Sequence, residues 1–216
     1  TVRENSSLYL QAPGALCTAA SLADILRALG IEVYLPETSG VMLGATRHSV
    51  KYIPKAHQAG FSGEICSYLT ADIGAYLMKE TPLTTAYGLK SIPKPDMIVF
   101  NTNQCREVAE WFSFYGREYN CPVVGIYPPR YLEDVSKTDI DNVVAQFNEV
   151  ISVGEKVLGK KLDPQKLEEV VGLSYDGTQL WKQVLETAKH TPSPLSFFDG
   201  TILMAPIVML RGTQIC

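Results

Sequence analysis

The sequence contains no Gly-x-Gly-x-x-Gly loop, no Walker loop and no Gly-x-Ser-x-Gly elbow. These segments hold backbone N–H groups or a nucleophile in a set geometry, so their absence leaves dinucleotide binding, P-loop chemistry and serine hydrolase chemistry without support. The histidines, His48, His57 and His190, lack His-x-x-His or His-Glu-x-x-His spacing. A structural zinc site needs four closely spaced ligands, and the sequence shows no such set.

Basic clusters and long apolar runs are also missing. The net charge is −4, and Lys and Arg form no stripe, so we predict no nucleic-acid partner. The most apolar late stretch, residues 197–210, contains Asp199, Gly200 and Pro206, and it is too short to span a bilayer. The first residues are polar and lack the apolar core of a signal peptide. We therefore expect no membrane partner and a cytoplasmic protein.

Cysteine is present, but not in a disulfide pattern. The five cysteines are an odd number, widely spaced, in a chain without secretory features, which favours reduced thiols or metal ligands. We interpret Cys17 and Cys121 as core residues, because free cysteine is often buried. Cys216 is terminal and carries no interpretation. Neither end of the chain shows an end-of-domain pattern, so we expect a piece of a longer protein.

The first part of the chain alternates strand and helix patterns. Strands are predicted over 31–35, 96–101 and 122–127, and helices over 21–29, 47–59, 67–78 and 106–119. Ser21 is the predicted N-cap of the first helix, Asp24 its capping-box partner and Gly30 its stop. Residues 36–40 are expected to end the first strand. This order predicts an α/β fold, a Rossmann-like parallel sheet flanked by helices.

The pattern changes after Pro128-Pro129. Helices are predicted over 140–158, 164–171 and 178–190, with Asp163 as an N-cap followed by Pro164 at the first helical position. We therefore predict an α/β domain over residues 1–130 and a helical extension over residues 131–216.

Two cysteines lie where a loop passes into a predicted helix. Cys66 precedes the helix 67–78, and Cys105 follows the strand 96–101 and precedes the helix 106–119. A helix N-terminus favours a thiolate through its partial positive charge and its unpaired N–H groups. Both positions also fall at the carboxyl side of the predicted sheet, where α/β proteins bind ligands. The alternative is that both are structural core thiols.

Glu37 follows the first predicted strand, on the same side of the sheet. A carboxylate near a ligand pocket acts as a general acid or base. The alternative for Glu37 is an exposed loop carboxylate with no role in chemistry.

These segments resemble the 2-hydroxyacyl-CoA dehydratase and benzoyl-CoA reductase subunit superfamily. The resemblance lies most specifically in Glu64-Ile65-Cys66-Ser67-Tyr68 and Asn101-Thr102-Asn103-Gln104-Cys105, each before a helix. Supporting segments are Leu26–Ile31, Leu35-Pro36-Glu37, Asp72-Ile73-Gly74, Trp111-Phe112, Cys121–Val124 and Pro192–Ser196.

The resemblance implies the N-terminal part of a subunit that holds a [4Fe–4S] cluster between two α/β domains. Cys66 and Cys105 match two cluster ligands, and the third would come from a second domain beyond Cys216. The implied partners are a related second subunit, giving a heterodimer, and an ATP-dependent iron–sulfur activator protein. The substrate would be an acyl-CoA. Glu37 matches the region of an acidic residue near the substrate, which implies proton transfer at the acyl-CoA.

The resemblance implies one of three functions. The first is an (R)-2-hydroxyacyl-CoA dehydratase, in which an electron delivered to the thioester gives a ketyl radical that loses water. The second is a benzoyl-CoA reductase, in which the aromatic ring is reduced. The third is a non-catalytic electron-transfer or scaffold subunit of the same fold. A plain α/β binding domain with structural thiols is the alternative outside the family.

Overall fold

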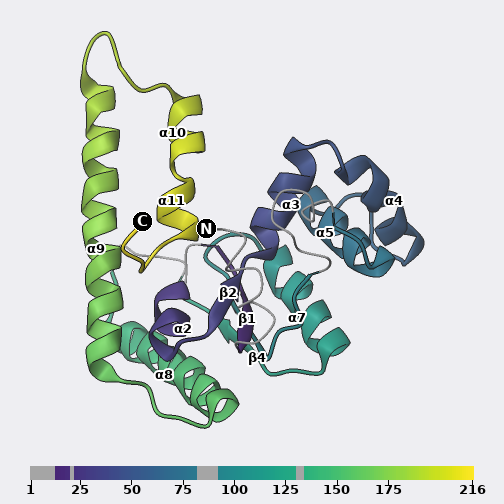
Figure 1. Ribbon diagram of the computed structural model, residues 1–216, viewed down its shortest axis with the longest axis horizontal. Helices are drawn as coiled ribbons and strands as arrows, with labels where there is room; N and C mark the ends of the chain where they lie inside the picture. Colours follow the sequence, from purple (N-terminus) through teal and green to yellow (C-terminus); the bar gives the residue numbers. More distant parts are fainter. Residues whose placement is uncertain (1–12, 20–21, 82–91, 130–133) are drawn as a thin grey trace.

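A parallel sheet of four strands lies at the centre of the protein (Figure 1). The structure, a computed structural model, describes residues 13–19, 22–81, 92–129 and 134–216. The strand order is β2-β1-β3-β4, and every neighbouring pair is parallel. The strands are β1 (Gly14–Cys17), β2 (Glu32–Tyr34), β3 (Met97–Asn101) and β4 (Val123–Ile126). The predicted Rossmann-like α/β fold is confirmed, although the sequence analysis missed β1.

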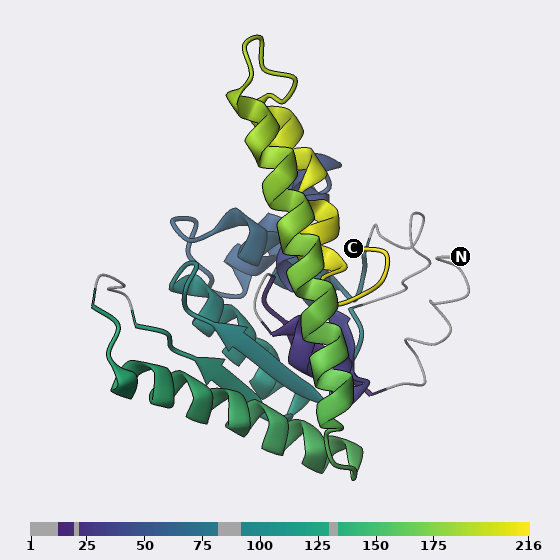
Figure 2. The ribbon, with the colours of Figure 1, turned by 90° about the vertical axis from the view of Figure 1, so that its left-hand side faces the viewer.

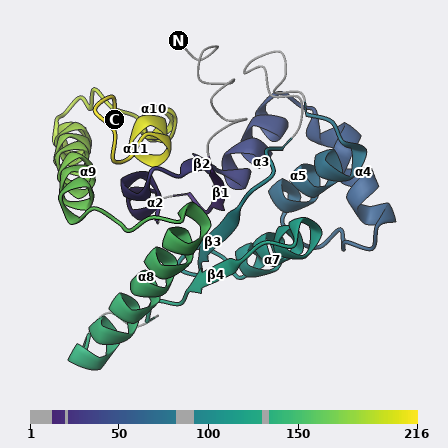
Figure 3. The same ribbon diagram turned by 60° about the horizontal axis from the view of Figure 1, so that its bottom comes forward.

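Helices cover both faces of this sheet. One face packs against α2 (Ala23–Leu29) and α8 (Lys137–Leu158), and the other packs against α5 (Ser67–Met78) and α7 (Glu107–Tyr119). Figures 2 and 3 show α8 lying along one side of the sheet, with α7 across β4 from it. Met97 and Val99 contribute to the first core and Ile98 and Phe100 to the second. This two-sided burial explains why β3 is a continuous apolar run rather than an alternating one.

Helices α3 (Pro36–Ala45) and α4 (Ser49–Gln58) pack on α5. The prediction that residues 36–40 only end a strand is wrong, because Pro36 opens a helix. Proline has a fixed φ and lacks an N–H, and both properties suit the first helical position. We call α3, α4, α5 and α7 the helical lobe (Figure 1).

The chain after α8 forms a second helical region. Helix α9 (Pro164–Glu186), the 3-10 turn η1 (Thr187–Lys189), α10 (Phe197–Leu203) and α11 (Ala205–Met209) form what we call the helical arm. The arm lies on the opposite side of the molecule from α3, α4 and α5 (Figure 1). The sequence predicted two helices where α9 is continuous. Asp163 does cap α9 through Gln165 N–H, at 2.9 Å, as predicted.

A polar contact joins the arm to the sheet layer. Asp24 of α2 accepts a hydrogen bond from the Ser174 hydroxyl at 2.6 Å and lies 3.3 Å from Arg211 Nε. The residue at the N-cap of α2 is Leu22, not the predicted Ser21, and Asp24 makes this tertiary contact. Its expected partner, Ser21, lies outside the described residues. Gly30 ends α2 with φ of 81°, as predicted. Nowhere in the described ranges is a helix both long and apolar enough to cross a membrane.

Candidate functional site

The candidate site lies at the carboxyl ends of β1 and β3. These strands are neighbours, and the chain leaves them for opposite edges of the sheet, toward β2 and toward β4. Such a switch point is where open α/β sheets bind ligands, because the loops that follow the two strands diverge there. Ala19 follows β1, and Cys105 follows β3.

Cys66 is the N-cap residue of α5, as the sequence predicted. Its side chain is half-buried and packs against the apolar cluster between α5 and α7. Its backbone carbonyl accepts the N–H of Thr70 at 3.1 Å, so the first turn of α5 begins at this residue. The Cys66 side chain forms no capping hydrogen bond to the N–H groups of this turn.

Cys105 lies between the end of β3 and the N-cap of α7, Arg106, and its side chain is exposed. The turn that carries it is held by Asn101, whose Oδ1 accepts the N–H of Asn103 at 3.2 Å. The backbone N–H of Asn101 in turn donates to Thr18 Oγ1 at 3.2 Å, which ties this turn to the end of β1.

The thiol of Cys105 does not follow the expectation for a helix N-terminus. Desolvation raises its pKa, and the negative charges of Glu107, Cys66 and Glu37 raise it further. The Val108 N–H acts in the opposite direction and does not outweigh them. At Cys105 these effects oppose the stabilisation of a thiolate that a helix N-terminus provides. A positively charged ligand at this point would reverse the balance.

Glu37 lies in the first turn of α3, not in a loop. Burial raises the pKa of its carboxyl, while the hydrogen bond from the Ala19 N–H lowers it. The carbonyl of Ala19 accepts a hydrogen bond from Gln104 Nε2 at 3.1 Å. One peptide segment after β1 thus connects Glu37 with the residue next to Cys105.

Two of the predicted site residues, Cys66 and Glu37, lie within electrostatic range of the third, Cys105. The charges of both Cys66 and Glu37 act on Cys105, although the three residues come from different elements. Two thiols and one carboxyl are an incomplete set for a metal. Across the described ranges, no group of three or more His, Cys, Asp or Glu side chains is arranged to hold a metal ion.

The other cysteines lie elsewhere. Cys17 is fully buried in the core, as predicted. Cys121 is half-buried against the apolar cluster of α5 and α7, and its pKa is raised by desolvation. Cys216 lies 3.6 Å from the Pro206 carbonyl oxygen. Cys66 and Cys105 are therefore the thiols that the fold gathers at the switch point.

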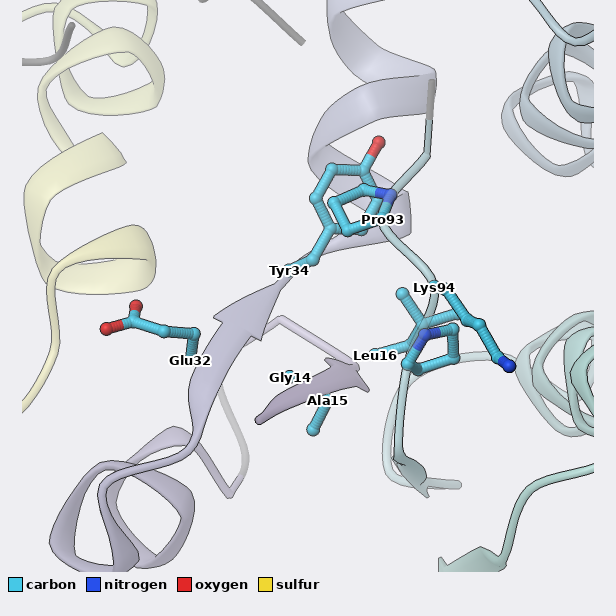
Figure 4. A pocket seen from close by; sticks show the side chains of 8 residues that line it. Gly14, Ala15, Leu16, Glu32, Tyr34, Pro93 and Lys94 are labelled. Atoms are coloured by element: carbon cyan, nitrogen blue, oxygen red, sulfur yellow. The ribbon is translucent and has the colours of Figure 1, made fainter. Parts of the chain in front are cut away.

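A small hollow lies beside β1, β2 and the segment before β3 (Figure 4). Its lining includes Gly14, Glu32 and Pro95, which lie at or before the amino ends of β1, β2 and β3. It holds about 10 Å³, room for about one water molecule. This hollow is too small for a substrate, and its lining includes none of Cys66, Cys105 and Glu37.

Comparison with known proteins decides the family. The family model for the 2-hydroxyglutaryl-CoA dehydratase D-component matches residues 19–215. The chain belongs to this family. The match includes all three candidate site residues and the whole described sheet except β1.

Curated members of the family include two kinds of enzyme. The (R)-2-hydroxyisocaproyl-CoA dehydratase alpha subunit of Clostridioides difficile is 31% identical over 195 residues, which cover 88% of this chain and 46% of the relative. The (R)-phenyllactyl-CoA dehydratase alpha subunit of Clostridium sporogenes is 29% identical, covering 92% and 47%. A benzoyl-CoA reductase subunit of Thauera aromatica is 35% identical, covering 83% and 41%. The chain spans about half the length of these relatives.

Sequence reasoning missed the residues that connect the site. Ala19 acts through its backbone, so its residue type gives no indication of the contact. Gln104 belongs to the segment Asn101–Cys105 that carries the family resemblance, but the sequence does not indicate its contact with Ala19. Asp72 belongs to a supporting segment of that resemblance, although an Asp between Ala71 and Ile73 on an apolar helix is a recognisable sign of a buried carboxyl.

Proposed function

We propose that this chain is the cluster-binding part of a subunit of a radical acyl-CoA enzyme of the (R)-2-hydroxyacyl-CoA dehydratase type. The observation that carries the proposal is the gathering of Cys66, Cys105 and Glu37 at the switch point of the sheet. Family membership supports it, because two of the relatives above are dehydratase alpha subunits. By the same resemblance, the assembly includes a related second subunit and an ATP-dependent activator.

Cys66 and Cys105 would bind the iron of a [4Fe–4S] cluster through their thiolates. The fit is partial but specific: iron–sulfur clusters take cysteine thiolates, and these two thiols converge from separate elements. Iron would also offset the negative charges that raise the pKa of Cys105. The remaining ligands would come from outside the described residues, since these contain no third ligand beside the pair. A bound cluster would supply single electrons to an acyl-CoA.

Glu37 would hold and transfer a proton at the acyl-CoA. Loss of water from a 2-hydroxyacyl group requires proton transfers, and a carboxyl serves best when its pKa lies closer to neutral pH. Burial raises the pKa of Glu37 in that direction. The Ala19 N–H holds one carboxylate oxygen, which leaves the other available to a substrate.

Iron analysis of the full-length protein tests the cluster assignment. The protein should be purified without oxygen. Its iron content, its sulfide content and its absorbance at about 400 nm should then be measured. We expect Cys66→Ala and Cys105→Ala each to lose most of the iron. The matched control is Cys121→Ala, a half-buried cysteine away from the site, which should keep it. Unchanged iron in both site variants would contradict the proposal.

Benzoyl-CoA reduction is the second candidate. The observation that favours it is the 35% identity to the benzoyl-CoA reductase subunit, against 31% and 29% for the two dehydratase subunits. The assembled enzyme, supplied with an electron donor and ATP, should be given a 2-hydroxyacyl-CoA and benzoyl-CoA in parallel. Formation of an enoyl-CoA supports the first candidate, and a reduced ring supports the second.

A further inference from the structure

Asp72 of α5 is a buried carboxyl that the site described above does not include. It is 0% exposed. Its Oδ2 accepts two hydrogen bonds from α7, one from Tyr115 OH at 2.6 Å and one from Trp111 Nε1 at 3.1 Å. Both donor residues are themselves buried. The carboxyl therefore joins α5 to α7 inside the apolar layer.

The same carboxyl faces α3 and the end of β2. The Ser39 hydroxyl of α3 stabilises the charged form of Asp72, and the charge of Asp72 contributes to raising the pKa of Tyr34, after burial. Oδ1 has no hydrogen-bond partner of good geometry within the described residues. Ser39 is two residues from Glu37 on the same helix. Asp72 of α5 is thus hydrogen-bonded to α7 and lies within electrostatic range of Ser39 in α3.

Burying a carboxyl costs free energy unless hydrogen bonds or a cation compensate for the lost water. None of the ion pairs formed by the described residues includes Asp72. A buried carboxyl without a cation depends on its hydrogen-bond donors, and an apolar residue would avoid the desolvation cost altogether. The donors come from the helices that begin at the candidate site.

Each of the three helices begins at a site residue. Glu37 lies in the first turn of α3, Cys66 caps α5, and Cys105 precedes α7. Asp72 is six residues after Cys66, about 9 Å along the helix axis. At this distance, a buried group that joins α5 to α7 is placed to influence how the N-termini of these helices are spaced.

The spacing of α3 against α5 is also tight near the site. A Cβ on Gly40 of α3 would lie 2.8 Å from Tyr68 Cβ and 2.9 Å from its backbone oxygen. Tyr68 is two residues from Cys66. Helices α3 and α5 therefore touch at Gly40, close to Cys66.

We propose that Asp72 is a positioning residue, whose hydrogen bonds from Trp111 and Tyr115 of α7, together with the close contact of α3 with α5 at Gly40, set the spacing of Cys66, Cys105 and Glu37. The proposal deepens the proposed function and relies on it for the purpose of that spacing. The spacing itself can be measured without a cluster.

The test is the bridging of Cys66 to Cys105 by a short bifunctional thiol reagent. The full-length protein, freed of bound metal, is treated with the reagent, and the bridged peptide is quantified by mass spectrometry. Asp72→Ala removes the acceptor and leaves two buried donors unpaired, so we expect the yield to fall about fivefold or more. Asp72→Asn keeps an oxygen acceptor and should restore most of the yield.

Two further variants keep the test decisive. Tyr115→Phe removes only the hydroxyl that donates to Asp72 and should lower the yield, even if Asp72→Ala fails to fold. Ile73→Ala is the matched control, because Ile73 is the buried neighbour of Asp72 and its truncation loosens the same core. The yield is compared at equal folded fraction, measured by circular dichroism.

Three results would overturn the proposal. They are no bridging in the wild-type protein, undiminished bridging in Asp72→Ala and Tyr115→Phe, and an equal fall in Ile73→Ala. Iron content is measured separately on the untreated protein. A protein that bridges as expected but binds no iron would refute the proposed function and leave the positioning role of Asp72 intact.

Discussion

The helical lobe and the helical arm bury their apolar side chains to very different degrees. In the lobe, Phe112 of α7 is 0% exposed and residues 69–75 of α5 are all buried. In the arm, Phe197 of α10 is 93% exposed, and neither α10 nor α11 has a buried residue. Both regions are helical. Helix formation therefore does not distinguish them, whereas packing against the sheet does.

Their polar contacts differ in the same way. The lobe uses a buried carboxyl, Asp72, shared by several elements. The outer part of the arm, α10, uses exposed capping groups, such as the Ser196 hydroxyl, which accepts the Asp199 N–H at 3.2 Å, whereas α9 is joined to α2 through the Ser174–Asp24 hydrogen bond. Buried hydrogen bonds couple elements, while exposed caps stabilise one helix end. We therefore expect changes in the lobe to act on the whole fold and changes in the arm to act locally.

The same substitution in the two regions gives the largest expected contrast. Phe112→Ala should lower the free energy of unfolding by about 3–5 kcal/mol, because it leaves a cavity in the core. Phe197→Ala should change it by less than about 0.5 kcal/mol, since the ring is exposed. Urea unfolding followed by circular dichroism measures both. Equal losses would show that the arm is as tightly packed as the lobe.

Asp72 should make stability depend on pH. Burial raises its pKa from 3.8 to about 6, so the folded protein holds a proton that the unfolded chain releases between these values. Stability from this group is greatest at low pH, and the free energy of unfolding falls by about 3 kcal/mol as the pH rises from about 4 to above 6. Its neighbours Tyr34 and Tyr115 titrate far above this range, because burial raises their pKa values.

Urea unfolding across this pH range checks the prediction. Asp72→Asn should remove the fall, because the amide does not titrate. The matched control is Asp141→Asn, an exposed aspartate on α8 whose Oδ2 lies 2.5 Å from Lys137 Nζ. It should leave the fall in place. An unchanged fall in Asp72→Asn would assign the effect to another group.

Glycine-to-alanine substitutions test the same contrast between lobe and arm through smaller changes in the free energy of unfolding. A Cβ on Gly74 of α5 would lie 2.1 Å from the backbone oxygen of Tyr52, so Gly74→Ala should separate α4 from α5 and cost about 1–3 kcal/mol. A Cβ on Gly172 of α9 meets nothing within 4 Å. Gly172→Ala should therefore stabilise the protein by up to about 1 kcal/mol through helix propensity. Thermal unfolding measures the opposite signs, and a loss at Gly172 would reveal a packed arm.

The smallest expected effect is a change at a helix cap. Ser196→Ala removes the capping box of α10 and should cost about 1 kcal/mol, seen as faster amide hydrogen exchange in α10 alone. The matched change is Ser136→Ala, which removes the capping box of α8, a helix packed on the sheet. That variant should lower global stability by a similar amount. Global destabilisation by Ser196→Ala would contradict the local character of the arm.

Several features of the site could be predicted from the sequence because they depend on local patterns. The bounds of α5, Ser67–Met78, agree with the prediction, since the apolar periodicity starts directly after Cys66. The placement of Cys105 after β3 follows from a run that is buried on both faces. Gly30 and Asp163 were predicted because helix ends need particular residues.

Other features depend on contacts that no local pattern contains. Glu37 was expected in a loop, but it lies in α3, which begins at Pro36 and packs closely against Tyr68 of α5 at Gly40. The sequence predicted two helices where α9 is one. An isolated glycine such as Gly172 or Gly177 costs only about 1 kcal/mol within a helix, so the packing of α9 on its neighbours keeps the helix continuous. Strand β1 has four residues, and its parallel partners lie far along the chain.

The sequence by itself determined the α/β class, the family and the two cysteines at helix starts, because periodicity, capping and short motifs are local properties. Only the tertiary structure decided that Cys66, Cys105 and Glu37 lie together, that Ala19 and Gln104 connect them, and that Asp72 is buried between three helices. The reason is physical. These relations depend on the order of strands in the sheet and on the distance between helices, and both are set by packing between residues remote in sequence.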